Sequence, residues 1–120
     1  MSNTPLIDQM RKAGSWNTAW DEFAEFDPLW TEKFMDMGTL PIRSGVLDRK
    51  TIELLLLAVN ASCMHLYAPG VRRHIGGALD QGASKEEIMA VLQLVTAMGI
   101  QSCSLGAPIL KEALAAREGS

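Results

Sequence analysis

Three side chains in the middle of this sequence have the right chemistry for acid/base catalysis: Glu53, His65 and His74. Glu53 lies in an apolar run, where a buried carboxylate must be paired, hydrogen-bonded or protonated. A histidine changes charge near neutral pH and can donate or accept a proton. His74 shares an apolar helix face with Val71 and Ile75, so it is expected to face the core. We therefore predict a buried acid/base pocket of all three residues, in which Glu53 and His74 lie within hydrogen-bonding reach.

Each of these residues also has a simpler structural explanation. Glu53 could be held by Arg49, four residues earlier, or by a contact between subunits. His74 could be a core histidine with a single hydrogen bond, and His65 a loop residue exposed to solvent. The sequence leaves these alternatives open.

Four further side chains are candidates for substrate binding: Asn60, Cys63, Tyr67 and Arg72. Asn60 follows Glu53 by two helical turns and so falls on nearly the same helix face. Cys63 and Tyr67 lie in the joint that also contains the first histidine. Arg72 lies in the first turn of a predicted helix, where the helix dipole disfavours positive charge and attracts anions. We expect Arg72 to hold a substrate carboxylate.

Metal binding is not predicted, because Glu53, His65 and His74 are twelve and nine residues apart and match no recognised ligand motif. Cys63 and Cys103 form no Cys-x-x-Cys pair. The sequence therefore favours a cofactor-independent enzyme that decarboxylates, or transfers a proton on, a small carboxylated or enolisable compound. One alternative is a thiol-dependent oxidoreductase with Cys63 as nucleophile and His65 as its base. Another is a non-catalytic oligomer that binds a ligand or a partner protein.

The elements that must position these residues are predicted to be helices joined by short loops. Helix starts are indicated by Asp27 before Pro28, by Asp48, and by a capping box of Ser84 with Glu87. No segment has a strand pattern. The predicted helices cover residues 15–25, 27–38, 48–62, 69–81, 84–98 and 101–117. The sequence thus predicts a single all-α domain over residues 1–120, a bundle of about six helices.

Several details of these helices follow from apolar spacing and from helix breakers. Ser15 is expected to cap the first helix, and the apolar residues on all sides of 48–62 predict a central, buried helix. Pro69 and Gly70 predict a sharp turn before the helix that carries His74. Pro108 either kinks the last helix or starts a new one.

The composition excludes several classes of protein. Hydrophobic residues make up 48% of the chain, which predicts a globular fold that buries its apolar surface partly in an oligomer. The net charge is −3 and there is no run of Lys or Arg, so nucleic acid is not an expected partner. The apolar stretch 52–64 is too short to span a bilayer, so no membrane contact is predicted. The start of the sequence lacks the pattern of a signal peptide, and with only two cysteines we expect a cytoplasmic protein.

Residues 48–110 resemble the carboxymuconolactone decarboxylase family, which also includes alkylhydroperoxidase D-like proteins. The resemblance is carried by three segments, Lys-Thr-Ile-Glu-Leu at 50–54, His-Ile-Gly-Gly-Ala-Leu at 74–79 and Gln-Gly-Ala-Ser-Lys-Glu-Glu-Ile at 81–88. Glu-Phe-Asp-Pro at 25–28 and Gly-Val-Leu-Asp at 45–48 extend it over most of the chain.

This resemblance implies an alkylhydroperoxidase D-like helical bundle, assembled as a homotrimer or homohexamer. It also implies a pocket built from Glu53 and His74, and a carboxylated lactone or a product of aromatic degradation as the substrate. Peroxidase members of the family carry a Cys-x-x-Cys pair whose second cysteine lies four residues before the histidine. Here that position is Gly70, so the chain resembles a variant branch without the redox pair.

Overall fold

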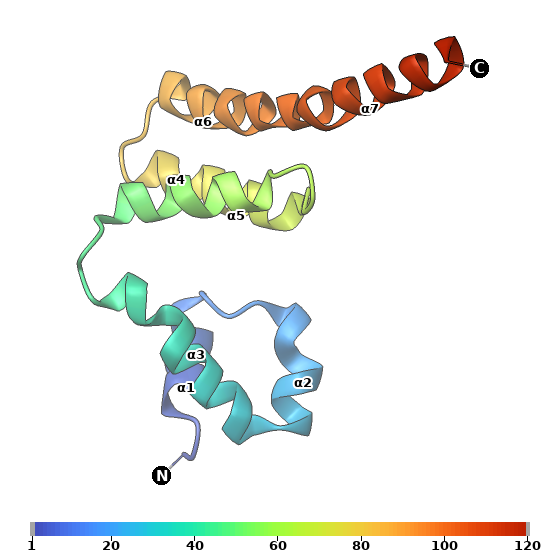
Figure 1. The fold of residues 1–120 in the computed structure, drawn as a ribbon. Helices are drawn as coiled ribbons and strands as arrows, with labels where there is room; N and C mark the ends of the chain where they lie inside the picture. Colours follow the sequence, from blue (N-terminus) through green and yellow to red (C-terminus); the bar gives the residue numbers. More distant parts are fainter. Residues whose placement is uncertain (1, 120) are drawn as a thin grey trace. The chain divides into compact units, whose positions relative to one another are not determined.

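In a computed structural model, which describes residues 2–119, the chain is helical throughout (Figure 1). These residues form seven α-helices and two short 3-10 helices in six continuous segments, and no strand is found among them. The elements are α1 (Pro5–Ala13), η1 (Thr18–Trp20), α2 (Asp21–Phe26), α3 (Pro28–Arg43), α4 (Arg49–Asn60), α5 (Ala68–Asp80), α6 (Lys85–Ala97), η2 (Met98–Ile100) and α7 (Gln101–Glu118). The predicted all-α fold is confirmed.

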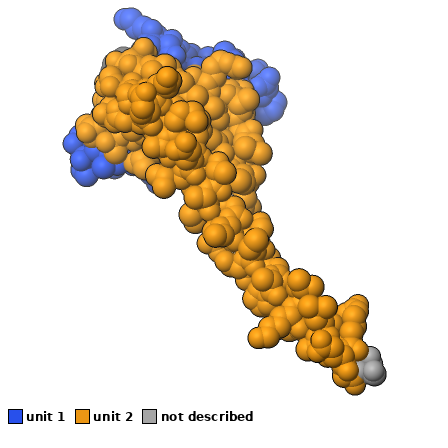
Figure 2. All heavy atoms as spheres, turned by 90° about the horizontal axis from the view of Figure 1, so that it is seen from above, with its two compact units in different colours: residues 1–47 blue, residues 48–120 orange. Residues whose placement is uncertain are grey.

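The chain divides into two compact units, residues 1–47 and residues 48–120, which Figure 2 shows in different colours. The first unit contains α1 to α3, and the second contains α4 to α7. Both histidines and the candidate glutamate belong to the second unit.

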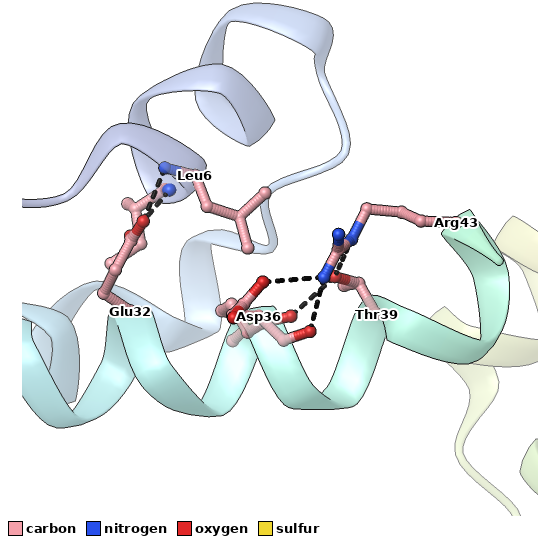
Figure 3. Close-up of polar contacts among 7 residues, drawn as sticks. Leu6, Glu32, Asp36, Thr39 and Arg43 are labelled. Carbon is pink, nitrogen blue, oxygen red and sulfur yellow. Dashed lines mark hydrogen bonds and ion pairs between the residues drawn. The ribbon is translucent and has the colours of Figure 1, made fainter.

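The first unit packs α1, α2 and α3 around a small core of Ile7, Trp16, Ala24 and Met35. Glu32 of α3 ties α1 to α3, because its carboxylate accepts hydrogen bonds from the backbone N–H groups of Leu6 and Ile7 at 2.6 and 3.0 Å (Figure 3). These donors lie in the first turn of α1, where backbone N–H groups have no partner within the helix. A glutamate distant in sequence thus caps α1.

Asp21 holds the start of α2 against α1. Its Oδ1 accepts hydrogen bonds from Trp16 Nε1 at 2.8 Å and from Arg11 Nη1 at 3.0 Å. These contacts, first of all the one with the Trp16 indole, lower the pKa of the Asp21 carboxyl.

The second unit is built on α4 and α5, which lie side by side as an antiparallel pair (Figure 1). The chain enters α4 through Asp48, whose carboxylate accepts a hydrogen bond from Thr51 N at 2.7 Å. The start of α6 packs against this pair, and its Ile88 joins a core with Leu57, Ala78 and Ala83. A salt bridge of 2.8 Å between Lys50 Nζ and Glu87 Oε2 links α4 to α6.

The predicted capping box of α6 is confirmed. Ser84 Oγ accepts a hydrogen bond from Glu87 N, and Glu87 Oε1 accepts one from Ser84 N, both at 3.0 Å. Since this box uses Oε1 and the salt bridge uses Oε2, one carboxylate fixes both the start of α6 and its contact with α4.

Helices α6, η2 and α7 continue one another without a break from Lys85 to Glu118. Pro108 and Gly106 lie inside α7, so Pro108 does not start a new helix. This run is long and apolar enough to cross a membrane by length and composition alone, and only 6% of its most apolar 18-residue window is buried. Beyond the part of α6 that packs on α4 and α5, the run extends with no buried residue in α7.

Three sequence predictions about the first unit were wrong. The predicted helix 15–25 begins only at Thr18, and Asn17 rather than Ser15 caps it through Ala19 N. Helix α1 was not predicted. The helix from Pro28 passes Gly38 and Pro41 and ends at Arg43, although its predicted Asp27 cap is confirmed.

Arg43 ties the last turn of α3 to the turns before it. Pro41 has no N–H to donate to the Met37 carbonyl one turn earlier. The Arg43 guanidinium reaches back past Pro41 and donates hydrogen bonds to Thr39 Oγ1 at 3.1 Å and to the carbonyl and carboxylate oxygens of Asp36 at 2.6 and 2.7 Å (Figure 3). These contacts join the segments of α3 on either side of Pro41.

Three further corrections concern the second unit. Helix α4 ends at Asn60, and it is not buried on all sides, because Leu55 and Val59 are 51% and 60% exposed. Helix α5 begins at Ala68, with Pro69 in its first turn, where a missing N–H costs little. Gly70 is therefore a buried helical residue and not part of a sharp turn.

The Lys50–Glu87 pair gives a test of this arrangement through pH. The pKa of the Glu87 carboxyl is lowered, mainly by the hydrogen bond from Lys50, and that of Lys50 is raised by the same contact. A lowered pKa stabilises the fold above the ordinary value of 4.5, and this contribution is lost as the pH falls through the folded pKa. We expect Glu87→Gln to lower the melting temperature at pH 7 but much less at pH 3.

Glu86→Gln is the matched control, since Glu86 lies in the same helical turn and is exposed. It removes a charge of the same sign near the positive end of the α6 dipole. Equal losses of melting temperature for both variants at pH 7 would contradict the role of the Lys50–Glu87 pair.

Candidate acid/base site

Glu53 and His74 meet across the interface between α4 and α5. His74 Nδ1 lies 2.7 Å from Glu53 Oε2, a short hydrogen bond, and the two side chains are only 16% and 12% exposed. This confirms the sequence prediction that the two residues lie within hydrogen-bonding reach. A carboxylate among leucines thereby has the partner that its burial requires.

The pair fixes which nitrogen of His74 can react. An ionised carboxylate only accepts hydrogen bonds, so with Glu53 ionised the proton of this contact lies on Nδ1. The other ring nitrogen, Nε2, makes no hydrogen bond in the described part of the chain. No buried side-chain nitrogen or oxygen among the described residues lacks a partner, so Nε2 is accessible from outside. His74 thus offers one nitrogen for proton transfer while the other is held by Glu53.

Arg49 is the cation beside the pair. Its Nη2 lies 3.8 Å from Glu53 Oε1, one helical turn before Glu53, and its side chain is 57% exposed. Arg49 was considered from the sequence only as a structural partner of Glu53. In the structure Glu53 has both Arg49 and His74, one on each carboxylate oxygen.

Asn60 lies two turns further along α4. Its Nδ2 donates a hydrogen bond to Leu56 O at 2.7 Å, and its amide lies directly against Gly70 of α5. A Cβ atom at position 70 would lie 2.5 Å from Asn60 Cγ, closer than real side chains approach. Asn60 and Glu53 thus both face α5, as expected for one helix face, but the Asn60 amide is engaged with its own helix and with Gly70 and makes no hydrogen bond to the pair within residues 2–119.

The joint between α4 and α5 holds the other predicted residues away from the pair. Cys63, His65 and Tyr67 are exposed, and the rings of His65 and Tyr67 lie 5.6 Å apart, centre to centre. Within residues 2–119 no hydrogen bond or ion pair joins His65 to Glu53 or His74. The prediction that His65 lines the same buried pocket was wrong, because the chain does not fold this joint over the pair.

Arg72 is also exposed, in the second turn of α5. Its predicted contact with a substrate carboxylate stays a prediction. Two hollows in the described part of the chain do not include Glu53 or His74. One, of about 440 Å³, is lined by Met37, Leu40, Pro41, Ser44, Val46 and Leu47, and the other, of about 280 Å³, lies around Arg11 and Asp21. The pair lies at the interface between α4 and α5, largely buried but reachable from outside.

The donor set does not suit a metal ion. No group of three His, Cys, Asp or Glu side chains that could hold one is found among residues 2–119. Glu53 and His74 are only two ligand-type side chains, and one oxygen of the carboxylate already meets a guanidinium. A protein zinc site needs three or four such ligands.

Most of the sequence matches a known family model. The model of the carboxymuconolactone decarboxylase family matches residues 28–117. The chain belongs to this family. Curated proteins give no match to the chain.

The chain is also similar to a crystal structure of a proposed gamma-carboxymuconolactone decarboxylase subunit from Burkholderia xenovorans LB400. The sequences are 36% identical, the TM-score is 0.81, and the match covers 98% of this chain but 48% of that one. The chain thus spans about half the length of this similar protein.

Gly70 occupies the position at which peroxidase members of the family carry the second cysteine of their redox pair. Gly70 is buried, and any side chain there would meet the Asn60 amide. A cysteine at position 70 would need the Asn60 side chain or the two helices to shift.

A double-mutant cycle measures the central contact. Glu53→Ala and His74→Ala should each lower the free energy of unfolding. The double variant should lose less unfolding free energy than the two single variants together, with a coupling free energy of about 1.5 kcal/mol for a largely buried, charged hydrogen bond. Urea denaturation at pH 7 gives the four stabilities. A coupling near zero would show that the 2.7 Å contact does not stabilise the protein.

Proposed function

We propose that this protein is a metal-independent and cofactor-independent enzyme of the decarboxylase or proton-transfer type, in which Glu53 and His74 carry out acid/base catalysis. The observation that carries the proposal is the short hydrogen bond between Glu53 Oε2 and His74 Nδ1, which leaves Nε2 accessible. A general acid needs a nitrogen that reaches substrate and a partner that holds the ring in place. The pair supplies both.

In a decarboxylation, the bond between the carboxyl carbon and its neighbour breaks, carbon dioxide leaves, and the electron pair stays on the substrate as an enolate. The protonated His74 ring then delivers the Nε2 proton to the carbanion carbon and becomes neutral, while its Nδ1–H continues to donate a hydrogen bond to Glu53. Glu53 holds the ring in place during this transfer. In an isomerisation, the neutral ring would instead remove a proton through the same Nε2.

The substrate class in this proposal is a small carboxylated compound, such as a lactone acid from aromatic degradation. The guanidinium of Arg49 lies beside the pair, and its exposed side chain is free to meet an anion. Arg72, the candidate from the sequence, lies two residues before His74 on α5, and side chains two apart on a helix do not face each other. A carboxylate held by Arg49 would lie near the proton-donating ring.

The thiol alternative has less support. Cys63 is exposed, and the position that corresponds to the second cysteine of the family's redox pair is the buried Gly70. In the structural alternative, Glu53 and His74 only hold α4 and α5 together. An activity assay on variants of the pair distinguishes this alternative from catalysis.

Activity can be tested by incubating the purified chain with a panel of small lactone acids and β-keto acids and measuring the release of carbon dioxide. We expect Glu53→Gln and His74→Gln to lower the rate on a turned-over substrate by about 100-fold or more, the usual contribution of a general acid. Cys63→Ser should keep the wild-type rate.

The controls separate the three explanations. Loss of activity in Cys63→Ser alone would favour the thiol enzyme, and full activity in both pair variants would leave only a structural role for the pair. Circular dichroism checks that each variant is folded. A stoichiometric metal in the active preparation, found by elemental analysis, would contradict the metal-independent mechanism.

We also propose that the exposed α6–α7 run is covered by further copies of this chain in a cytoplasmic homotrimer or homohexamer. Residues 88–110 carry no charge, and Leu94, Leu105 and Ile109 are 69%, 70% and 55% exposed. The start of the run already packs in a protein core through Ile88, which favours protein over lipid as its surroundings. The similar crystal structure has about twice the length, which leaves room in that protein for a second unit of this kind.

Light scattering on the full chain tests this assembly. The wild type should show a mass of three or six chains, and Leu105→Glu should lower it, because a buried unpaired charge is costly. Val46→Glu is the matched control, since Val46 is 83% exposed in the first unit. A wild-type mass near 13.1 kDa, or recovery of the protein with lipid vesicles, would contradict the proposal.

A further inference from the structure

Two glycines of α5 lie against the two polar side chains of α4. Gly70 faces Asn60, and Gly77 faces Glu53. The two glycines are seven residues apart on α5, and the two polar residues are seven apart on α4. Because the helices are antiparallel, the earlier glycine meets the later polar residue. A Cβ atom on Gly77 would lie 2.5 Å from Glu53 Oε2, 2.6 Å from Cδ and 3.0 Å from Oε1. The Glu53 carboxylate thus occupies the space that a side chain at position 77 would need.

The backbone does not require a glycine at position 77. Positive φ angles among the described glycines occur at Gly14, Gly45 and Gly82, while Gly77 has helical geometry inside α5. A glycine in a helix interior is normally less stable than an alanine. The reason for Gly77 is therefore the space it leaves and not its backbone freedom.

We propose that Gly77 is a positioning residue for the acid/base pair. Because Gly77 has no side chain, the Glu53 carboxylate lies flat against α5, one helical turn after His74, and reaches Nδ1 at 2.7 Å. The catalytic part of this proposal rests on the proposed function, whereas the placement of Glu53 by Gly77 does not.

An alanine at position 77 would push the carboxylate out of this place. The contact involves both oxygens and Cδ, so a rotation of the carboxylate about its own axis would not relieve it. Relief requires either that Glu53 turns towards Arg49, whose side chain is more exposed, or that α4 and α5 separate. Either movement lengthens the contact with His74.

The neighbouring Gly76 offers a matched control on the same helix. A Cβ on Gly76 would have no atom within 4 Å outside the helix backbone and its chain neighbours. Gly76→Ala should raise the melting temperature through better helix propensity. Gly77→Ala should lower it by about 5 °C or more, as for a methyl group forced into a packed site. The same substitution at two neighbouring positions should therefore change the melting temperature in opposite directions.

A spectroscopic readout separates positioning from a loss of stability alone. In ¹⁵N-labelled protein, the Nδ1 proton of His74 should give a downfield resonance typical of a short hydrogen bond to a carboxylate. This resonance should be lost or shifted upfield in Gly77→Ala and in Glu53→Gln, and it should be unchanged in Gly76→Ala. An unchanged resonance in folded Gly77→Ala would overturn the proposal.

Rescue by a shorter side chain completes the test. Glu53→Asp removes the methylene that carries the carboxylate over position 77, so it should destabilise Gly77→Ala less than it destabilises the wild type. If Gly77→Ala does not fold, Gly77→Ala with Glu53→Ala should fold, because the obstructing side chain is gone. Failure of this double variant to fold, or equal effects of Glu53→Asp in both backgrounds, would overturn the proposal.

These measurements do not depend on a substrate. If Gly77→Ala alters stability and the His74 resonance as expected while no acid in the panel is turned over, the proposed catalytic function fails and the positioning by Gly77 stands. If the substrate assay succeeds and Gly77→Ala behaves like Gly76→Ala, the function stands and the positioning fails.

Discussion

The second unit depends on one constraint, which is that a carboxylate on an apolar helix must be neutralised where two helices meet. Glu53 lies among leucines on α4 and would be costly there without partners. His74 on α5 and Arg49 on α4 take one carboxylate oxygen each. The close approach that this requires is available because α5 has Gly77 at the point of contact. The same interaction that stabilises the helix pair therefore also orients a proton-transferring ring.

The other polar contacts fix the helix ends around this pair. Asp48 caps α4, Ser84 and Glu87 cap α6, and Lys50 joins the first turn of α4 to the first turn of α6. Each of these contacts lies at an exposed end, where water competes and the individual contribution to stability is modest. Together they set the register in which Ile88 enters the core beneath α4 and α5.

The apolar surface of the second unit is larger than its own core uses. Helix α4 is apolar on nearly all sides, and a single neighbouring pair of helices covers only one part of it, so Leu55 and Val59 are left exposed. The same holds for α7, which has no buried residue. A helix that is apolar all round is normally surrounded by protein or lipid on all sides.

The sequence by itself determined the all-α fold, the caps at Asp27, Asp48 and Ser84, and the meeting of Glu53 with His74, because each follows from short-range hydrogen bonding, helical spacing or the cost of an isolated buried charge. The passage of α3 and α7 through Pro41 and Pro108 and the exposed place of His65 were not predictable in this way. Local signals cannot reveal that the Arg43 side chain reaches back to Asp36, or that the joint after α4 stays open. Nor did they give Gly77 a role, since the value of an absent side chain depends on what the opposite helix brings against it. Only the tertiary structure decides which atoms face each other across two helices, because that register is set by packing between residues distant in the sequence.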